Sequence, residues 1–264
     1  MKKTFLAFLL VISLCLSGCS IEFTLCDHFL HRTSHDNAIS TEPVETYAPI
    51  AQDRYLATYR DPATNRDMDY HMYIPQNATE NMPLIVYLHG LGAVGPSKLN
   101  EDNPLIQQAM DIYGDEYPFL ILAPSSMLNK SWLSKELPAR VKSLIDYIAD
   151  LYHVDRNKII ITGHSMGAAG VMRQIELYGD FYSAAIPVSL PTTKNLDIEK
   201  YLDVPIWGFI GGKEAPINYY MQVMFEEMNE IGCYAIFTEL EGVEHGKSAL
   251  YAYMWDVFEW AISQ

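Results

Sequence analysis

Short apolar runs alternate with amphipathic stretches from about residue 53 to the C-terminus. The run 83–88 (PLIVYL) is apolar throughout, a pattern typical of a strand buried on both faces of a sheet. In the stretch 137–152 the apolar residues recur every three or four positions, so they share one face of a helix. Patterns of the first kind predict strands at 55–59, 67–74, 83–88, 119–123, 158–162, 183–188, 205–210 and 234–240. Patterns of the second kind predict helices at 137–152, 166–178, 217–231 and 248–262.

The order of these elements predicts the fold class. Strands that alternate with helices favour a mostly parallel sheet covered by helices on both faces. The first two strands are expected to form an antiparallel lead-in to that sheet. We therefore expect residues 53–264 to form one α/β domain. Because loops converge at the carboxyl ends of parallel strands, the residues that follow each strand are the candidates for chemistry.

Composition narrows the class of protein. The chain has 264 residues, of which 49% are hydrophobic, enough for a sizeable core. Its 33 acidic and 18 basic residues give a net charge of −15, and the basic residues form no stripe, which argues against nucleic-acid binding. The four cysteines are too few for a disulfide scaffold and lack the spacing of a zinc site, so no metal is predicted.

The N-terminus has the pattern of a secretory signal. Lys2 and Lys3 precede an apolar run of about a dozen residues, which is shorter than the roughly 20 that a membrane-spanning helix needs. The segment Leu16-Ser17-Gly18-Cys19 resembles a bacterial lipobox, and this resemblance implies cleavage after residue 18 and acylation of Cys19. An uncleaved membrane anchor is the alternative. The chain is thus expected to be extracytoplasmic and attached to a bacterial membrane by lipid.

Residues 19–52 are polar and irregular, and we interpret them as a tether that holds the globular body off the membrane. Three histidines lie in this tether without an accompanying ligand cluster, so a solvated linker is favoured over a metal site. Cys26 in the tether and Cys233 in the body could pair in an oxidising compartment, but the sequence leaves this open.

The strongest catalytic signal follows the predicted strand 158–162. The residues Gly163-His164-Ser165-Met166-Gly167 form a G-x-S-x-G pattern between a strand and a helix, the context in which this pattern presents a nucleophile. The glycines permit a tight turn that exposes the Ser165 hydroxyl, and the N-terminus of the following helix favours negative charge there. The alternative is a packing turn in which Ser165 only caps the helix.

Two backbone amides are candidates for stabilising an oxyanion. One belongs to Leu91, in the glycine-rich loop that follows the strand 83–88, and the other to Met166, directly after the serine. His89 in the same loop could be mistaken for the catalytic base. We interpret it instead as a residue that braces the loop through its ring nitrogens.

A serine nucleophile needs a base and an acid that orients this base. Of the histidines outside the tether, His245 is the candidate base because it lies in a loop after the last predicted strand. Glu214, after the strand 205–210, is the candidate acid. Asp197 is a less well placed alternative, and Asp203 precedes its strand and so belongs to the wrong edge of the sheet. His164 is expected to point away from Ser165.

These motifs together resemble those of α/β-hydrolases, in particular the phospholipase/carboxylesterase, polyhydroxybutyrate depolymerase-like and predicted-peptidase families. The resemblance runs from about residue 55 to the C-terminus and rests on the segments 83–92, 122–124 with Trp132, 152–167, 205–214 and 242–245. It implies an α/β-hydrolase fold with Ser165 as nucleophile and His245 as base. The chain departs from these relatives by carrying glutamate rather than aspartate at position 214, and alanine rather than glycine after the motif.

We therefore expect a serine hydrolase that cleaves carboxylic esters through a Ser-His-Glu triad and an acyl-enzyme, without a cofactor. The segment from Ser165 to Glu214 is too short to hold a large lid, which predicts an open cleft bordered by 92–104, 125–136 and 189–200. Trp132 is expected either to line the substrate site or to have a packing role in the core or at the surface. The substrate would be a small-molecule or polymer-linked ester. A serine peptidase and a catalytically silent surface-binding lipoprotein are the competing hypotheses.

Overall fold

The computed structural model describes residues 54–93, 103–126, 130–194, 196–254 and 256–264. The predicted signal, the tether and Cys19 lie outside these residues. Residues 94–102 and 127–129, which are parts of two predicted cleft-bordering segments, also lie outside them. Within the described part of the chain, no helix is long and apolar enough to cross a membrane.

The described residues form one eight-stranded sheet in the order β1-β2-β4-β3-β5-β6-β7-β8. Strands β3 to β8 run parallel to one another, whereas β1 pairs with β2, and β2 with β4, in antiparallel fashion. The predicted mostly parallel sheet with an antiparallel lead-in is therefore confirmed. The strands are β1 Arg54–Asp61, β2 Arg66–Tyr73, β3 Leu84–Leu88, β4 Leu120–Pro124, β5 Ile159–His164, β6 Ala184–Val188, β7 Ile206–Gly211 and β8 Ala235–Leu240.

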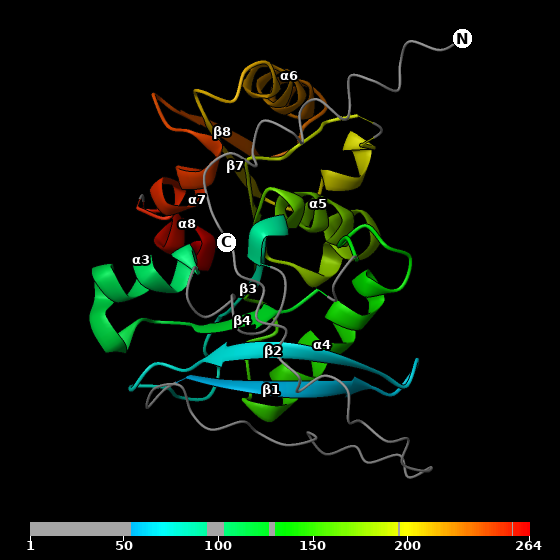
Figure 1. The fold of residues 1–264 in the computed structure, drawn as a ribbon, viewed down its shortest axis with the longest axis vertical. Coiled ribbons are helices and arrows are strands. Elements are labelled where there is room, and N and C mark those ends of the chain that lie inside the picture. The colour runs from blue at the N-terminus through cyan, green and yellow to red at the C-terminus, as the bar shows by residue number, and fades with distance from the viewer. Residues whose placement is uncertain (1–53, 94–102, 127–129, 195, 255) are drawn as a thin grey trace, which may run out of the picture. The chain divides into compact units, whose positions relative to one another are not determined.

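Helices cover both faces of this sheet, as Figure 1 shows with the sheet seen edge-on. Successive side chains of a strand point to opposite faces, so a fully apolar strand supplies two cores at once. In β3, Leu84, Val86 and Leu88 join the core beneath α4, α5 and α6, while Ile85 and Tyr87 join the core beneath α3, α7 and α8. The helices are α3 Pro104–Tyr113, α4 Leu137–Leu151, α5 Met166–Tyr178, α6 Ile217–Glu230, α7 Ser248–Ala252 and α8 Val257–Ser263.

Two helices differ from the sequence-based expectation. Helix α3 was not predicted, although its signals are present: the Asn103 side chain accepts a hydrogen bond from the Leu105 amide, and Pro104 occupies the first turn. The predicted helix 248–262 is broken into α7 and α8. Tyr253 and Phe258 are both buried in the core, yet in a continuous helix five positions correspond to a rotation of about 140°. The break lets both rings pack inward.

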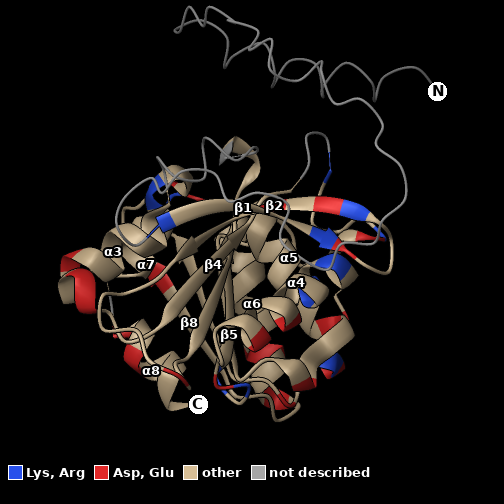
Figure 2. Cartoon of the chain, turned by 90° about the horizontal axis from the view of Figure 1, so that it is seen from below, with Lys and Arg blue, Asp and Glu red and all other residues tan. Residues whose placement is uncertain are grey.

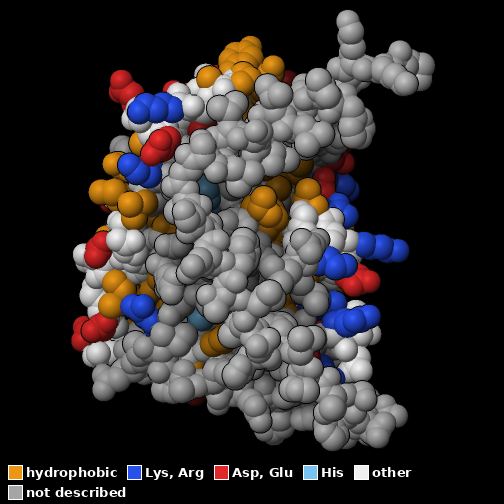
Figure 3. Space-filling model, viewed as in Figure 1, with side chains coloured by type: hydrophobic (Ala, Val, Ile, Leu, Met, Phe, Trp, Pro, Cys, Tyr) orange, Lys and Arg blue, Asp and Glu red, His pale blue; other side chains and the backbone are white. Residues whose placement is uncertain are grey.

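Charged residues are dispersed over the body, in agreement with the absence of a basic stripe in the sequence. Figure 2 shows Lys and Arg interspersed with Asp and Glu across the helices and the β1–β2 hairpin. In the space-filling view, the visible apolar side chains form several separate groups among these charges (Figure 3).

Candidate functional site

Ser165 lies in a strained turn between β5 and α5. Its backbone has φ 56° and ψ −115°, a conformation that side chains rarely adopt and that is associated with functional sites. The turn is held on both sides, because the Ser165 amide donates to the Val188 carbonyl (2.9 Å) and the Ser165 carbonyl accepts from the Ala169 amide (3.2 Å). The serine is therefore presented at the carboxyl edge of the sheet, as the G-x-S-x-G pattern predicts.

The glycines of this motif are required by close backbone approach. A Cβ atom placed on Gly167 would lie 1.8 Å from the Leu88 carbonyl oxygen, and one on Gly163 would lie 2.7 Å from the Gly167 carbonyl carbon. Both contacts are far shorter than any side chain tolerates. These glycines allow the start of α5 to sit against the end of β3, which brings the loop after β3 next to Ser165.

Ser165, His245 and Glu214 form a continuous hydrogen-bonded chain. His245 Nε2 lies 2.9 Å from Ser165 Oγ, and His245 Nδ1 lies 2.5 Å from Glu214 Oε2. An ionised carboxylate only accepts hydrogen bonds, so Nδ1–H donates to Glu214 and Nε2 accepts from the serine hydroxyl. The structure thus brings together the three side chains that the sequence proposed as nucleophile, base and acid.

The candidate acid Glu214 is buried, whereas the candidate base His245 is accessible. The Glu214 side chain is 6% exposed and the His245 side chain 48%. Burial alone would raise the pKa of Glu214, but hydrogen bonds from His245, Ser189 and the Gly211 amide outweigh it and leave the pKa below its ordinary value. The hydrogen bond to Glu214 raises the pKa of His245, against a smaller opposing effect of burial. Glu214 is therefore ionised when His245 is neutral.

Two serines that the sequence analysis did not single out complete the surroundings of the acid. Ser189 Oγ–H donates to Glu214 Oε1 (2.6 Å), and the Gly211 amide donates to the same oxygen (2.8 Å). Ser189 and Ser248 are buried with their hydroxyl oxygens 2.6 Å apart, and Ser248 donates to the His245 carbonyl (2.9 Å). The only signal in the sequence was the position of Ser189 directly after a predicted strand.

The loop after β3 is braced by His89, which is fully buried. His89 Nδ1–H donates to the Gly90 carbonyl (2.7 Å), and its Nε2 accepts from the Ser126 amide (3.0 Å). Burial lowers the pKa of His89, opposed by the bond to Gly90, so the ring is neutral at physiological pH. These contacts agree with the interpretation of His89 as a brace and leave no ring nitrogen for a role as base.

The two predicted oxyanion donors, Leu91 and Met166, belong to the loop after β3 and to the start of α5. A Cβ atom on Gly90 would lie 3.6 Å from Ser165 Cβ, so the loop that carries Leu91 is adjacent to the nucleophile. The Leu91 side chain is 73% exposed. Met166 is the first residue of α5, where a backbone amide has no partner within the helix. Both candidate amides therefore belong to segments that adjoin Ser165.

Trp132 does not line an accessible site. Its side chain is 2% exposed, its Nε1–H donates to the His89 carbonyl (2.9 Å), and a Cβ atom on Gly170 would lie 2.6 Å from Trp132 Cβ. The expectation that it contacts substrate is thus corrected in favour of the core alternative. Trp132 supports the loop after β3 because its indole N–H finds a partner there while its ring fills the space left by Gly170.

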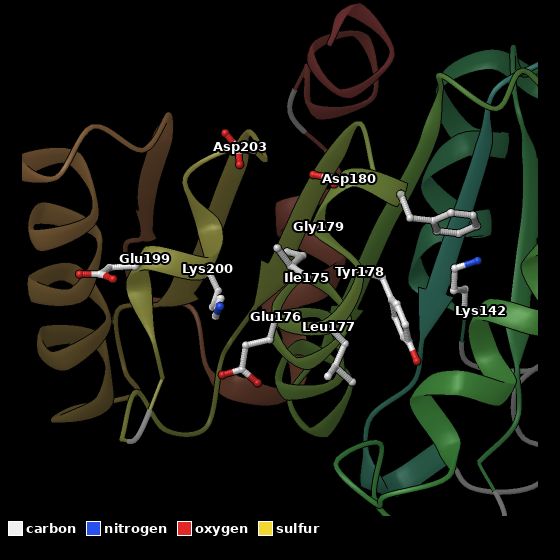
Figure 4. Close-up of a pocket in the computed structure, with 11 residues that line it drawn as sticks. Lys142, Ile175, Glu176, Leu177, Tyr178, Gly179, Asp180, Glu199, Lys200 and Asp203 are labelled. Atoms are coloured by element: carbon white, nitrogen blue, oxygen red, sulfur yellow. The ribbon is translucent and has the colours of Figure 1, made fainter.

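A separate pocket of about 540 Å³ lies at the far end of α5 from Ser165 (Figure 4). It is lined by residues of α4, the end of α5 and the η5 segment Ile198–Tyr201. Asp203 also lines this pocket, so it does not belong to the site at the carboxyl edge of the sheet. The lining residues are Lys142, Ile175, Glu176, Leu177, Tyr178, Gly179, Asp180, Phe181, Glu199, Lys200 and Asp203.

The described residues offer neither a metal site nor a disulfide bond. Among the residues that the structure describes, no group of three or more His, Cys, Asp or Glu side chains could hold a metal ion. Cys233 is buried with its thiol 3.8 Å from the Ile198 carbonyl. Cys26, whose pairing with Cys233 the sequence left open, lies outside the described residues.

Comparisons with known proteins point to esterases. No protein-family model matches the chain. Among curated proteins, the bifunctional acetylxylan esterase/xylanase XynS20E of Neocallimastix patriciarum is 24% identical over 157 residues, covering 57% of this chain and 22% of that protein. Among solved structures, a thermostable esterase matches with a TM-score of 0.70 and 28% identity, covering 80% of this chain and 63% of the other. A ferulic acid esterase matches with a TM-score of 0.65 and 16% identity, covering 80% and 98%.

The chain spans about a fifth of the curated relative and less than two thirds of the thermostable esterase. The structural matches nevertheless extend over most of the present chain, and they agree with the topology of the eight-stranded sheet. The protein has the α/β-hydrolase fold.

Proposed function

We propose that this protein is a serine hydrolase that cleaves carboxylic esters. The observation that carries the proposal is the hydrogen-bonded chain from Ser165 through His245 to Glu214, with the serine in a strained turn at a helix N-terminus. Ser165 is the nucleophile, His245 the base and Glu214 the acid that orients the base. The amides of Leu91 and Met166 hold the oxyanion.

In the acylation step, His245 Nε2 takes the proton of the Ser165 hydroxyl as Oγ attacks the ester carbonyl. Glu214 holds His245 in the tautomer whose proton is on Nδ1, and it stabilises the imidazolium that forms on His245. The Leu91 and Met166 amides stabilise the negative charge on the carbonyl oxygen. The attack forms a tetrahedral intermediate. Its collapse expels the alcohol, which takes its proton from His245, and leaves an ester between the acyl group and Ser165.

In the deacylation step, water replaces the alcohol. His245 removes a proton from the water as its oxygen attacks the acyl carbonyl, and then returns a proton to Ser165 Oγ as the acid departs. The exposed edge of His245 suits this step because water must reach Nε2.

The matched proteins support an ester as the substrate. They bear the names of a thermostable esterase, a ferulic acid esterase and an acetylxylan esterase/xylanase. We therefore propose an acyl ester of a small-molecule or polymer-linked alcohol as the substrate, with acetyl and aromatic acyl groups as the first to test.

A substrate panel combined with active-site labelling tests this function. The purified protein is expected to hydrolyse p-nitrophenyl acetate and methyl ferulate, and to turn over N-acetyl peptide p-nitroanilides at least about 100-fold more slowly. A fluorophosphonate probe is expected to add one label, located at Ser165 by peptide mass spectrometry. Faster cleavage of the anilides would instead favour a peptidase, and absence of both labelling and turnover would favour a non-catalytic binding protein.

We further propose that the mature protein is attached to a bacterial membrane through lipid on Cys19. The proposal is supported by the lipobox-like segment and by the charge, which becomes −17 when Lys2 and Lys3 leave with the signal. Anionic lipids would repel a body of that charge, so electrostatic attachment does not suffice. Cys19→Ser is expected to move the protein from the membrane to the soluble fraction with unchanged kcat for p-nitrophenyl acetate. A variant that still sediments with membranes would contradict the anchor, and Cys233→Ser serves as the matched control.

A further inference from the structure

His164, the residue before the nucleophile, contacts the loop that carries His245. Its Nε2 lies 2.9 Å from the His245 carbonyl oxygen, and the two imidazole rings are 4.8 Å apart between centroids. On its other side, a Cβ atom on Gly90 would lie 3.3 Å from His164 Nδ1. The His164 ring therefore lies between the loop after β3 and the loop after β8, and its own backbone continues into Ser165.

The hydrogen bond defines the state of the His164 ring. A carbonyl oxygen only accepts, so His164 Nε2 carries the proton that it donates. Burial, together with the neighbouring His245, lowers the pKa of His164 to about 4. His164 is thus neutral at the pH at which His245 is neutral, and it adds no positive charge beside the imidazolium that forms on His245 during catalysis.

Besides the ring contact with Glu214, the loop of His245 is joined to the loop after β7 by the Lys213 amide, which donates to the Val243 carbonyl (3.0 Å). Its residues are mostly exposed, and Gly242 has a positive φ of 72°. The His245 carbonyl accepts from two donors on different elements, His164 Nε2–H at the end of β5 and the Ser248 hydroxyl at the start of α7. Without the His164 donor, the segment that carries the base would be tied to the sheet less firmly.

We propose that His164 is a positioning residue: by donating its Nε2–H to the His245 carbonyl, it holds the base loop in register with Ser165. The inference rests on the proposed function and adds to it a residue that touches neither the substrate nor the reacting atoms. A misplacement of about 1 Å in such a site can cost on the order of 10²-fold in rate. The role therefore predicts an effect on kcat rather than on substrate binding.

Three variants test this role by steady-state hydrolysis of p-nitrophenyl acetate. His164→Leu removes the donor and is expected to lower kcat by about 30- to 100-fold while KM changes less than about threefold. His164→Gln, whose amide N–H can reach the same carbonyl, is expected to retain kcat within about fivefold of the parent. His153→Asn is the matched control, because His153 is an exposed histidine with a positive φ that asparagine tolerates, and it should leave kcat unchanged.

Fluorophosphonate labelling separates positioning from folding. His164→Leu is expected to label to the same final stoichiometry as the parent at a rate reduced in step with kcat, whereas misfolding would lower the stoichiometry alone. Nitrogen-15 NMR of the histidine rings in the unsubstituted protein gives a measurement that needs no variant: His164 should hold the Nε2–H tautomer from pH 6 to 9.

Either of two results would overturn the inference: an Nδ1–H tautomer of His164, or a His164→Leu kcat within about threefold of the parent. Equal loss in the Leu and Gln variants would also overturn it, since packing rather than the N–H would then matter. The proposed function fails separately, if Ser165 is neither labelled nor needed for turnover.

Discussion

Ser165→Ala is expected to lower kcat for p-nitrophenyl acetate by at least about 10⁴-fold, because removal of the nucleophilic hydroxyl leaves only the oxyanion donors and substrate binding to accelerate attack by water. Alanine retains the Cβ atom and the strained turn, so folding should be affected little. The expected free energy of unfolding lies within about 1 kcal/mol of the parent. Steady-state kinetics and thermal unfolding measure the two quantities on the same samples.

The matched control for this substitution is Ser263→Ala. Ser263 is exposed in α8 and its hydroxyl donates only to the Trp260 carbonyl, so kcat should not change. If Ser165→Ala retained more than about a tenth of the parent kcat, with no contaminating esterase in the preparation, Ser165 would not be the nucleophile.

Glu214→Gln is expected to lower kcat by about 10² to 10⁴-fold and to shift the pH dependence. The carboxylate accepts from His245 Nδ1–H over 2.5 Å, whereas an amide that presents its NH₂ would favour the wrong tautomer of the ring. The sign of the pH effect follows from His245, which must be neutral to act as base. Because the hydrogen bond to Glu214 raises the pKa of His245 above 6.5, activity of the parent should rise with pH through a midpoint above 6.5.

Loss of the carboxylate removes that stabilisation of the imidazolium, so the midpoint of the Glu214→Gln variant should move to lower pH. The measurement is kcat/KM for p-nitrophenyl acetate between pH 5 and 9, corrected for hydrolysis without enzyme. Glu244→Gln makes the same chemical change next to His245 in the sequence, on a side chain that is 62% exposed and lies 3.5 Å from Lys247. It should leave the midpoint in place, and an equal shift in both variants would contradict the role of Glu214.

Most of the sheet could be predicted from the sequence because its strands are local patterns. The inner parallel strands β3, β5 and β6 begin as apolar runs buried on both faces, and such runs are visible without knowledge of their partners. The helices were predicted where apolar residues recur at helical spacing. The break between α7 and α8 could not be predicted in this way, because it follows from the space that Tyr253 and Phe258 find in the core.

Some residues of the candidate site could be predicted from the sequence, and others could not. Ser165 could be found because its motif is contiguous, and Glu214 and His245 because each follows a strand at the active edge. The contact between Ser189, which binds Glu214, and Ser248, which binds the His245 carbonyl, could not be predicted, because these serines are 59 positions apart in the sequence. Trp132 was expected at the substrate site as one alternative, but it is buried against Gly170 of α5, a contact that no local pattern specifies.

The sequence by itself determined most of the elements, the tight turn at Ser165 and the three candidate side chains, because these follow from residue type and short-range spacing. Only the tertiary structure decided which hydrogen bonds those side chains make. The register of β5, β6 and β7 places the ends of these strands side by side, so that Ser165, Ser189 and Glu214 meet at one edge. His164 likewise acquires its contact with the base loop from a residue 81 positions away, and no local pattern specifies such a contact.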